Sequence, residues 1–99
     1  MKLEVLPTVW PEFLSSAEWY EMERRGLAAD LLDEAAATVD RIESGPLLFP
    51  VIYRDARRAQ LHRFPFGMFF TYKADHVVIF CIMHLRRDES VWKSHLPNS

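Results

Sequence analysis

Residues that can transfer protons or bind phosphate are concentrated in the last third of the sequence. Arginine holds phosphate through a planar, permanently charged group, histidine and tyrosine transfer protons, and aromatic rings stack on bases. Nine such residues follow one another here: Arg57, Arg58, His62, Arg63, Tyr72, His84, Arg86, Arg87 and Trp92. Together they would suit phosphodiester cleavage without a metal, because cations stabilise its transition state. In a second interpretation the arginines pair with carboxylates on the helices or with an acidic segment of a partner.

Charge is divided unevenly between the two halves of the chain. Residues 1–50 hold ten Asp and Glu against four Lys and Arg, whereas residues 51–99 hold four against eight. All four histidines also lie in the second half. The net charge of −2 argues against general binding to nucleic acid. The split predicts a dipolar molecule with an acidic cover and a basic working face.

Other kinds of site are not favoured by the sequence. The four histidines fit no zinc spacing, and a single cysteine, Cys81, completes neither a structural metal site nor an internal disulfide. Its position in an apolar strand indicates a small core residue. The three glycines form no phosphate-binding loop. The carboxylates lie on the expected solvent faces of helices, so paired-carboxylate hydrolysis has little support. No metal and no cofactor are predicted.

The length of 99 residues predicts one domain, over residues 1–96, with a flexible tail at 97–99. No apolar stretch approaches the roughly 18 residues that a membrane span needs, and the first residues do not resemble a signal peptide. We therefore expect no membrane association and a cytoplasmic location.

The first half predicts one edge strand and a helix. Residues 2–6 alternate in polarity and should form a strand near a sheet edge. A helix is expected from Trp10 to about residue 25, with Thr8 as its N-cap and Gly26 as its C-cap. Trp19 lies almost opposite the apolar stripe by which this helix should face the core, which includes Trp10, Phe13 and Ala17. We expect it to pack against the next helix; the alternative is a contact with a partner chain.

The second helix is the clearest element, over residues 27–44, and Gly45-Pro46 ends it. Its apolar stripe consists of Ala28, Leu32, Ala35, Val39 and Ile42, with Leu31 at the flank. The short connection predicts an antiparallel pair of helices that covers a sheet.

The second half predicts a loop over residues 47–55, attached to the core through Leu48 and Phe49, and then three strands. The strands are expected at 57–64, 68–72 and 77–84, with turns at 65–67 and 74–75 and a short helix at about 89–95 that returns Trp92 to the sheet. This order indicates an α+β fold in which a two-helix hairpin packs on one face of a small, mostly antiparallel sheet.

Alternation along the strands assigns their side chains to two groups. The side chains expected under the helices are Ala59, Leu61, Val77, Ile79 and Cys81. The expected working surface consists of Arg58, His62, His84, Arg86 and Arg87.

Four segments of the chain resemble toxins of the RelE/ParE superfamily, the stable partners in bacterial type II toxin-antitoxin pairs. They are Ala17-Glu18-Trp19-Tyr20; Phe49-Pro50 followed by Arg57-Arg58; Arg63-Phe64-Pro65-Phe66-Gly67; and His84-Leu85-Arg86-Arg87-Asp88 leading to Trp92. The resemblance extends from about residue 3 to residue 92, and it rests on the order and spacing of the segments together. It implies the same fold of two helices on a small antiparallel sheet.

The resemblance also implies a partner, a cognate antitoxin whose flexible acidic or amphipathic tail folds along the toxin. Operator DNA would be bound only through the antitoxin. Such modules act in growth inhibition and plasmid stabilisation. RelE-like members cleave mRNA in the ribosome, whereas ParE-like members poison DNA gyrase. The residues expected to bind the antitoxin are Trp19, Arg57 and Arg58.

Two observations favour the ParE-like alternative: the acidic pI of about 6.0 and an ending at residues 84–88 that is similar to ParE-like endings. Lysines, prominent in RelE-like sites, are nearly missing from this half. A ribonuclease would instead use Arg58, Arg63, Tyr72, His84 and Arg87 as catalytic residues. In either case His62, Arg86 and Trp92 would contact the target. A third alternative is a toxin fold that has lost its toxicity.

Overall fold

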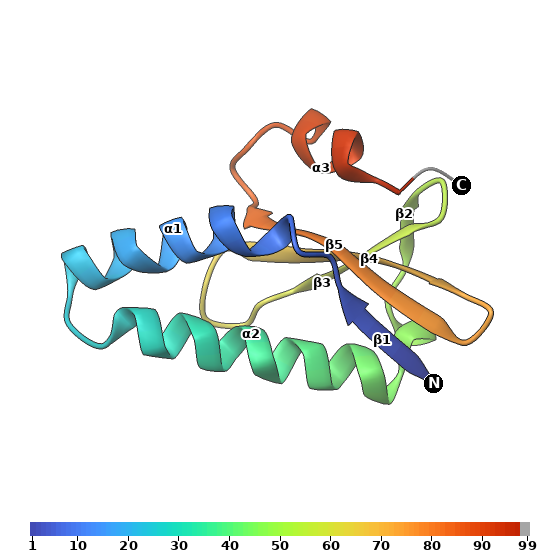
Figure 1. Ribbon diagram of the computed structural model, residues 1–99, viewed down its shortest axis with the longest axis horizontal. Coiled ribbons are helices and arrows are strands. Elements are labelled where there is room, and N and C mark those ends of the chain that lie inside the picture. Colours follow the sequence, from blue (N-terminus) through green and yellow to red (C-terminus); the bar gives the residue numbers. More distant parts are fainter. Residues whose placement is uncertain (98–99) are drawn as a thin grey trace.

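One five-stranded sheet, in the order β1-β5-β4-β3-β2, lies at the centre of the protein (Figure 1). The structure is a computed structural model and describes residues 1–97. The strands are β1 (Lys2–Val5), β2 (Val51–Tyr53), β3 (Ala56–Gln60), β4 (Phe66–Lys73) and β5 (His76–His84). All neighbouring strands are antiparallel except β1, which runs parallel to β5 at one edge. The predicted α+β fold is confirmed.

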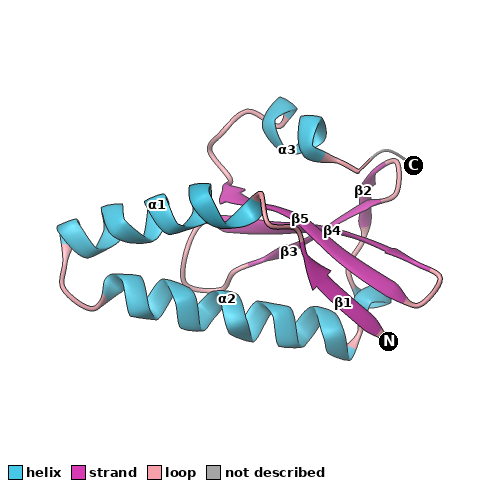
Figure 2. Ribbon diagram, in the orientation of Figure 1, coloured by secondary structure: helices cyan, strands magenta, loops and turns pink. Residues whose placement is uncertain are grey.

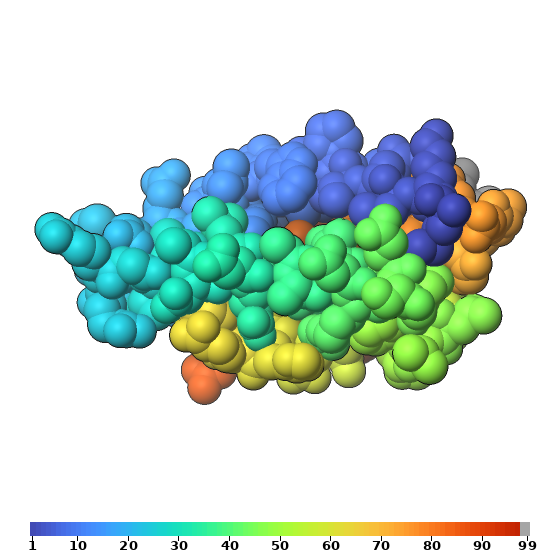
Figure 3. All heavy atoms as spheres, turned by 90° about the horizontal axis from the view of Figure 1, so that it is seen from below, coloured from blue at the N-terminus to red at the C-terminus, as the bar shows by residue number. Residues whose placement is uncertain are grey.

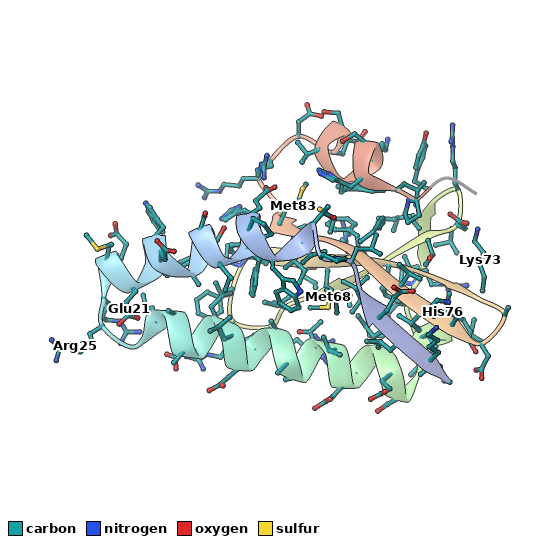
Figure 4. The ribbon with its side chains drawn as sticks, viewed as in Figure 1. Glu21, Arg25, Met68, Lys73, His76 and Met83 are labelled. Atoms are coloured by element: carbon teal, nitrogen blue, oxygen red, sulfur yellow. The ribbon has the colours of Figure 1, made fainter. Side chains whose placement is uncertain are left out.

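Helices cover both faces of this sheet. They are α1 (Val9–Glu23), α2 (Leu27–Ser44), a 3-10 turn η1 (Pro46–Leu48) and α3 (Ser90–His95). Figure 2 shows α2 and α3 on opposite sides of the strands. Two cores result: Phe13 and Ile42 belong to the larger one beneath α1 and α2, and Trp92 belongs to the smaller one beneath α3. Figure 4 shows Met68 and Met83 pointing toward these two different sides.

A β-bulge in β5 decides which core receives Cys81. Phe69 pairs with Cys81 but Phe70 pairs with Ile79, so Phe80 is an extra residue in β5. The extra residue reverses the alternation beyond it. Cys81 therefore lies in the α3 core, and its predicted place under the two long helices is wrong. Ala59, Leu61, Val77 and Ile79 are in the larger core as predicted.

The buried face of α2 differs from the predicted stripe. Leu31, Ala35, Thr38 and Ile42 are buried, whereas Leu32 is 41% exposed. Apolar residues occupy two adjacent faces of this helix, and the position of α2 between α1 and β3 selects one of them. The predicted core role of Leu32 is therefore wrong.

The turn between the two long helices is built differently from the prediction. Helix α1 ends at Glu23, and Gly26, with φ of 92°, precedes α2 instead of capping α1. Both carboxylate oxygens of Glu21 accept the N–H of Gly26, and one of them accepts that of Ala28, at 3.1 Å each. Thr8 stands at the N-cap position of α1, but its side chain makes no capping hydrogen bond.

The connection between β3 and β4 also differs from the prediction. Strand β3 ends at Gln60 and β4 begins at Phe66, so the expected strand to residue 64 and turn at 65–67 are wrong. The backbone leaves the sheet because Glu34 of α2 accepts the N–H groups of His62 and Arg63. The loop expected at 47–55 is wrong, because this segment contains the end of η1 and the whole of β2, a fourth strand in this half of the chain. Phe49 packs edge-on against Phe70 as expected, but Leu48 is 86% exposed and does not reach the core.

Within residues 1–97, no helix is both long and apolar enough to cross a membrane. Residues 98 and 99 of the predicted flexible tail lie outside the described residues.

Candidate functional site

The residues predicted to form a catalytic set lie at opposite ends of the sheet. Phe66 pairs with His84 at one end of the β4–β5 hairpin, and Tyr72 pairs with Val77 near the other end. Tyr72 lies six positions after Phe66 along β4, which at about 3.3 Å per position is about 20 Å. The Tyr72 hydroxyl contacts Asp75 of the hairpin turn at 3.3 Å. Tyr72 and His84 therefore do not share a site.

The same residues are also divided between the two faces of the sheet. The His84 ring lies edge-on to Phe66, a member of the larger core, with the centroids 5.3 Å apart. Arg58 is exposed and lies on the α3 face, where its side chain crosses Gly67 beside Leu85. The structure therefore does not bring Arg58 and His84 together.

Three of the predicted arginines are held by groups of this chain. Arg57 donates to the carbonyl oxygen of Phe49 at 2.6 Å. Arg63 pairs with Asp30 of α2, with 3.4 Å between Nη2 and Oδ2. Arg87 pairs with Glu12 of α1. The last two contacts correspond to the second interpretation, in which arginines pair with carboxylates on the helices.

The remaining predicted residues differ in exposure. Trp92 is only 5% exposed because it stacks on Phe69, with the ring centroids 4.8 Å apart. In this arrangement it contributes to the α3 core and offers little surface to a target. His62 and Arg86 are exposed, and Trp19 is 59% exposed. Trp19 touches Tyr20 edge-on, with the ring centroids 5.1 Å apart, and lines a pocket with residues of α1, β4 and β5.

A pocket of about 290 Å³ forms where α1 passes the end of β5. We call it the ring pocket; its lining residues are Ser16, Trp19, Tyr20, Phe66 and His84. Trp19 and His84 are each singled out by the sequence, but the sequence does not predict that they line the same pocket. The spacing of Ser16, Trp19 and Tyr20 on one helix was visible in the sequence, but the pairing of Phe66 with His84 depends on strand register.

One hydrogen bond decides which nitrogen of the neutral His84 ring can act as a donor. Its Nδ1 atom accepts the backbone N–H of Arg86 at 3.0 Å. In the neutral ring the proton therefore sits on Nε2, which is a hydrogen-bond donor. Among residues 1–97, no hydrogen bond or ion pair engages the Arg86 guanidinium, while the adjacent Arg87 is neutralised by Glu12.

A second, larger depression of about 440 Å³ lies between α1 and α2. We call it the helix groove; its lining residues are Val5, Trp10, Phe13, Leu32, Ala35, Ala36, Val39, Asp40, Met68 and Ile82. Figure 3 shows this hollow between the two helices, with atoms of a later segment visible at its base. Trp10, predicted to face the core, is 42% exposed at its rim.

No protein-family model matches this chain, and no curated protein matches it significantly. The resemblance to RelE/ParE toxins therefore rests on the sequence segments described above.

Burial and hydrogen bonds shift the pKa values of one thiol and three carboxyl groups. Burial raises the pKa of the Cys81 thiol to about 11, which keeps it protonated and a poor nucleophile at neutral pH. Backbone hydrogen bonds lower the pKa values of Glu21, Glu34 and Asp88. In residues 1–97, no group of three His, Cys, Asp or Glu side chains is arranged to hold a metal ion.

Proposed function

We propose that this chain is the toxin of a bacterial type II toxin-antitoxin module of the RelE/ParE superfamily, and that its cognate antitoxin occupies the helix groove. The apolar groove between α1 and α2 is the main support for this proposal. Trp10, Leu14 and Leu32 are 42%, 45% and 41% exposed on the two helices that form it. Exposed apolar patches of this kind mark surfaces that bind another protein. A toxin that is held inactive by a bound antitoxin needs such a surface.

The groove also indicates the chemistry of the antitoxin segment. Its floor is apolar, and Asp40 lines its side. Asp33 lies seven residues earlier and Glu43 three residues later, so both project on the same side of α2. An amphipathic helix with one apolar stripe flanked by Lys or Arg complements this surface. The module would act in the cytoplasm, and operator DNA would be bound through the antitoxin.

For the target we propose DNA gyrase, as in ParE-like toxins. Two observations support a target that is not cleaved by this chain. The residues of the alternative ribonuclease site are spread over both faces and both ends of the sheet, and two of its arginines pair with carboxylates of this chain. The net charge of −2 also provides little attraction for ribosomal RNA. The mRNA endonuclease remains the second candidate because His84 and Arg86 are accessible.

Induced expression without the antitoxin separates these functions. A gyrase toxin should arrest growth, induce the DNA-damage response and, when purified, trap gyrase-cleaved plasmid DNA. A ribosome-dependent endonuclease should instead stop translation and leave cleaved mRNA while gyrase remains active. Normal growth at a verified protein level would contradict both and indicate a fold without toxicity. Coexpression with the product of the adjacent small reading frame should restore growth under either toxic function.

A further inference from the structure

The ring pocket shares no lining residue with the helix groove proposed for the antitoxin, although it contains Trp19, one of the residues that the sequence predicts to bind the antitoxin. We propose that it binds a single aromatic side chain of a partner protein, and that His84 and Arg86 receive a carboxylate adjacent to that side chain. This inference goes beyond the proposed function and does not depend on whether the chain is a toxin.

The size and lining of the pocket favour one ring as the ligand. Its volume of about 290 Å³ is at the lower end of ligand pockets, which are typically about 300 to 1,000 Å³. Four of its five lining side chains carry rings, and they already meet edge-on, as Trp19 does with Tyr20 and Phe66 with His84. Tyr20 is fixed further by Phe64, with the centroids 5.3 Å apart. Rings that already pack on one another lose less side-chain entropy when a further ring binds.

His84, which lines the pocket, and the nearby Arg86 favour an anionic neighbour for that ring. The Nδ1 atom of His84 is occupied by the Arg86 N–H, so the ring presents Nε2–H as a donor. The same hydrogen bond holds the backbone N–H of Arg86 3.0 Å from the pocket-lining His84. Arg86 is not itself a lining residue, but its side chain is exposed and has no ion-pair partner among residues 1–97. One donor and one free cation match a single carboxylate.

The surrounding carboxylates argue against a nucleic acid at this site. Glu12, Ser16, Trp19 and Glu23 follow one another at intervals of four, three and four residues and lie on one face of α1. Glu12 is neutralised by Arg87, whereas Glu23 has no partner among the described side chains. A polyphosphate carries several negative charges, so Glu23, four residues after Trp19 on α1, would repel it more strongly than it would repel a single carboxylate. A protein segment with an aromatic residue beside Asp or Glu is therefore the better match.

The test uses three capped peptides and two-dimensional ¹H–¹⁵N NMR of the full chain. The probes are Gly-Ser-Trp-Asp-Gly-Ser, the same peptide with Ala for Trp, and the same peptide with Lys for Asp. The Trp-Asp peptide should shift the Trp19 indole and Arg86 amide resonances in a saturable manner. The Ala and Lys peptides should bind at least about tenfold more weakly, since each loses one of the two contacts.

Variants of exposed residues provide the controls. Trp19→Ala and Arg86→Glu should each weaken the Trp-Asp peptide about tenfold or more, and Arg86→Glu should strengthen the Trp-Lys peptide. The matched controls are Trp10→Ala, at the helix groove, and Arg25→Ala, at the far tip of the helix hairpin (Figure 4), and neither should change binding. Equal binding of all three peptides, no saturable shift, or tighter binding of oligoadenylate at the same resonances would overturn the proposal. None of these results bears on gyrase, so this proposal can fail separately from the toxin function.

Discussion

The side-chain Oε1 atom of Glu34 accepts the backbone N–H of His62 at 2.7 Å, which joins α2 to the turn between β3 and β4. The same oxygen accepts the N–H of Arg63 at 2.9 Å. A comparable contact joins α1 to α2, because Glu21 accepts the N–H groups of Gly26 and Ala28. Glu21 of α1 thus fixes the turn that leads to α2, and Glu34 of α2 fixes the turn between β3 and β4.

These carboxylates predict how stability changes with pH. Hydrogen bonds from Gly26 and Ala28 lower the pKa of Glu21 below its ordinary 4.5, and those from Arg63 and His62 lower that of Glu34. Below pH 4.5 the unfolded chain binds more protons at these groups than the folded chain. Their stabilisation is therefore complete above pH 4.5 and is lost as pH falls through the folded pKa values.

Urea titrations from about pH 6 to about pH 3 measure this effect. The Glu21→Gln/Glu34→Gln variant should be less stable at pH 6 and should lose less stability on acidification than the original protein. Glu18→Gln/Glu43→Gln, on the exposed faces of the same helices, is the matched control and should follow the original curve. Parallel curves for all three proteins would contradict the role assigned to Glu21 and Glu34.

Trp92→Ala should destabilise the protein by about 3 kcal/mol, since it removes the ring that stacks on Phe69 and leaves a cavity beneath α3. Urea denaturation followed by circular dichroism measures the change. Trp19→Ala, which removes an indole that is 59% exposed, should cost much less. Similar losses for the two variants would show that the α3 core contributes little to stability.

Gly67→Ala should cost about 1 to 3 kcal/mol through overpacking on the α3 face. The added Cβ would lie 2.7 Å from Cδ2 of Leu85, 3.1 Å from Cε1 of Phe69 and 3.2 Å from Cδ of Arg58. The Leu85 side chain is the closest contact, so Leu85→Ala should relieve part of the strain. A double-mutant cycle by urea denaturation should give a double variant that is more stable than the sum of the single changes predicts. Simple additivity would rule out this contact as the cause.

Leu32→Glu should prevent rescue by the antitoxin without abolishing growth arrest. The change places a carboxylate at the rim of an apolar groove that already contains Asp40, and the antitoxin should bind at least about 30-fold more weakly, equivalent to about 2 kcal/mol. Coexpression and pull-down measure the effect. Leu47→Glu changes a leucine that is 68% exposed away from the groove and should leave rescue intact. Full rescue of Leu32→Glu would place the antitoxin elsewhere.

Tyr72→Phe should leave growth arrest unchanged if gyrase is the target, because the change removes only the exposed contact between this hydroxyl and Asp75. If Tyr72 were a catalytic acid or base of an endonuclease, cleavage should fall about 100-fold or more. Growth curves under graded induction, with toxin levels compared by immunoblot, distinguish the two results. A loss of arrest with normal folding would favour the endonuclease.

Local pattern in the sequence determined the order and type of the main elements. The 3.6-residue periodicity of residues 27–44 and the apolar run of residues 77–84 each limit the backbone to one form, and Gly45-Pro46 ends α2 through its own stereochemistry. The short helix expected at about 89–95 predicts that Trp92 returns to the sheet, and Trp92 is buried in the α3 core. These patterns depend on residues within about one turn of helix or one strand, so the type of each of these elements can be predicted without knowing the tertiary contacts.

Only the tertiary structure decided which faces are buried and which residues meet. Leu31 is buried and Leu32 exposed because α2 is held between α1 and β3, and both positions are apolar in the sequence. The extra residue Phe80 moves Cys81 to the other core, and a bulge depends on pairing with β4. The register that sets Phe66 opposite His84 creates the ring pocket and also separates His84 from Tyr72. Long-range pairing and packing fix these relationships, and they are not contained in the spacing of residues along the chain.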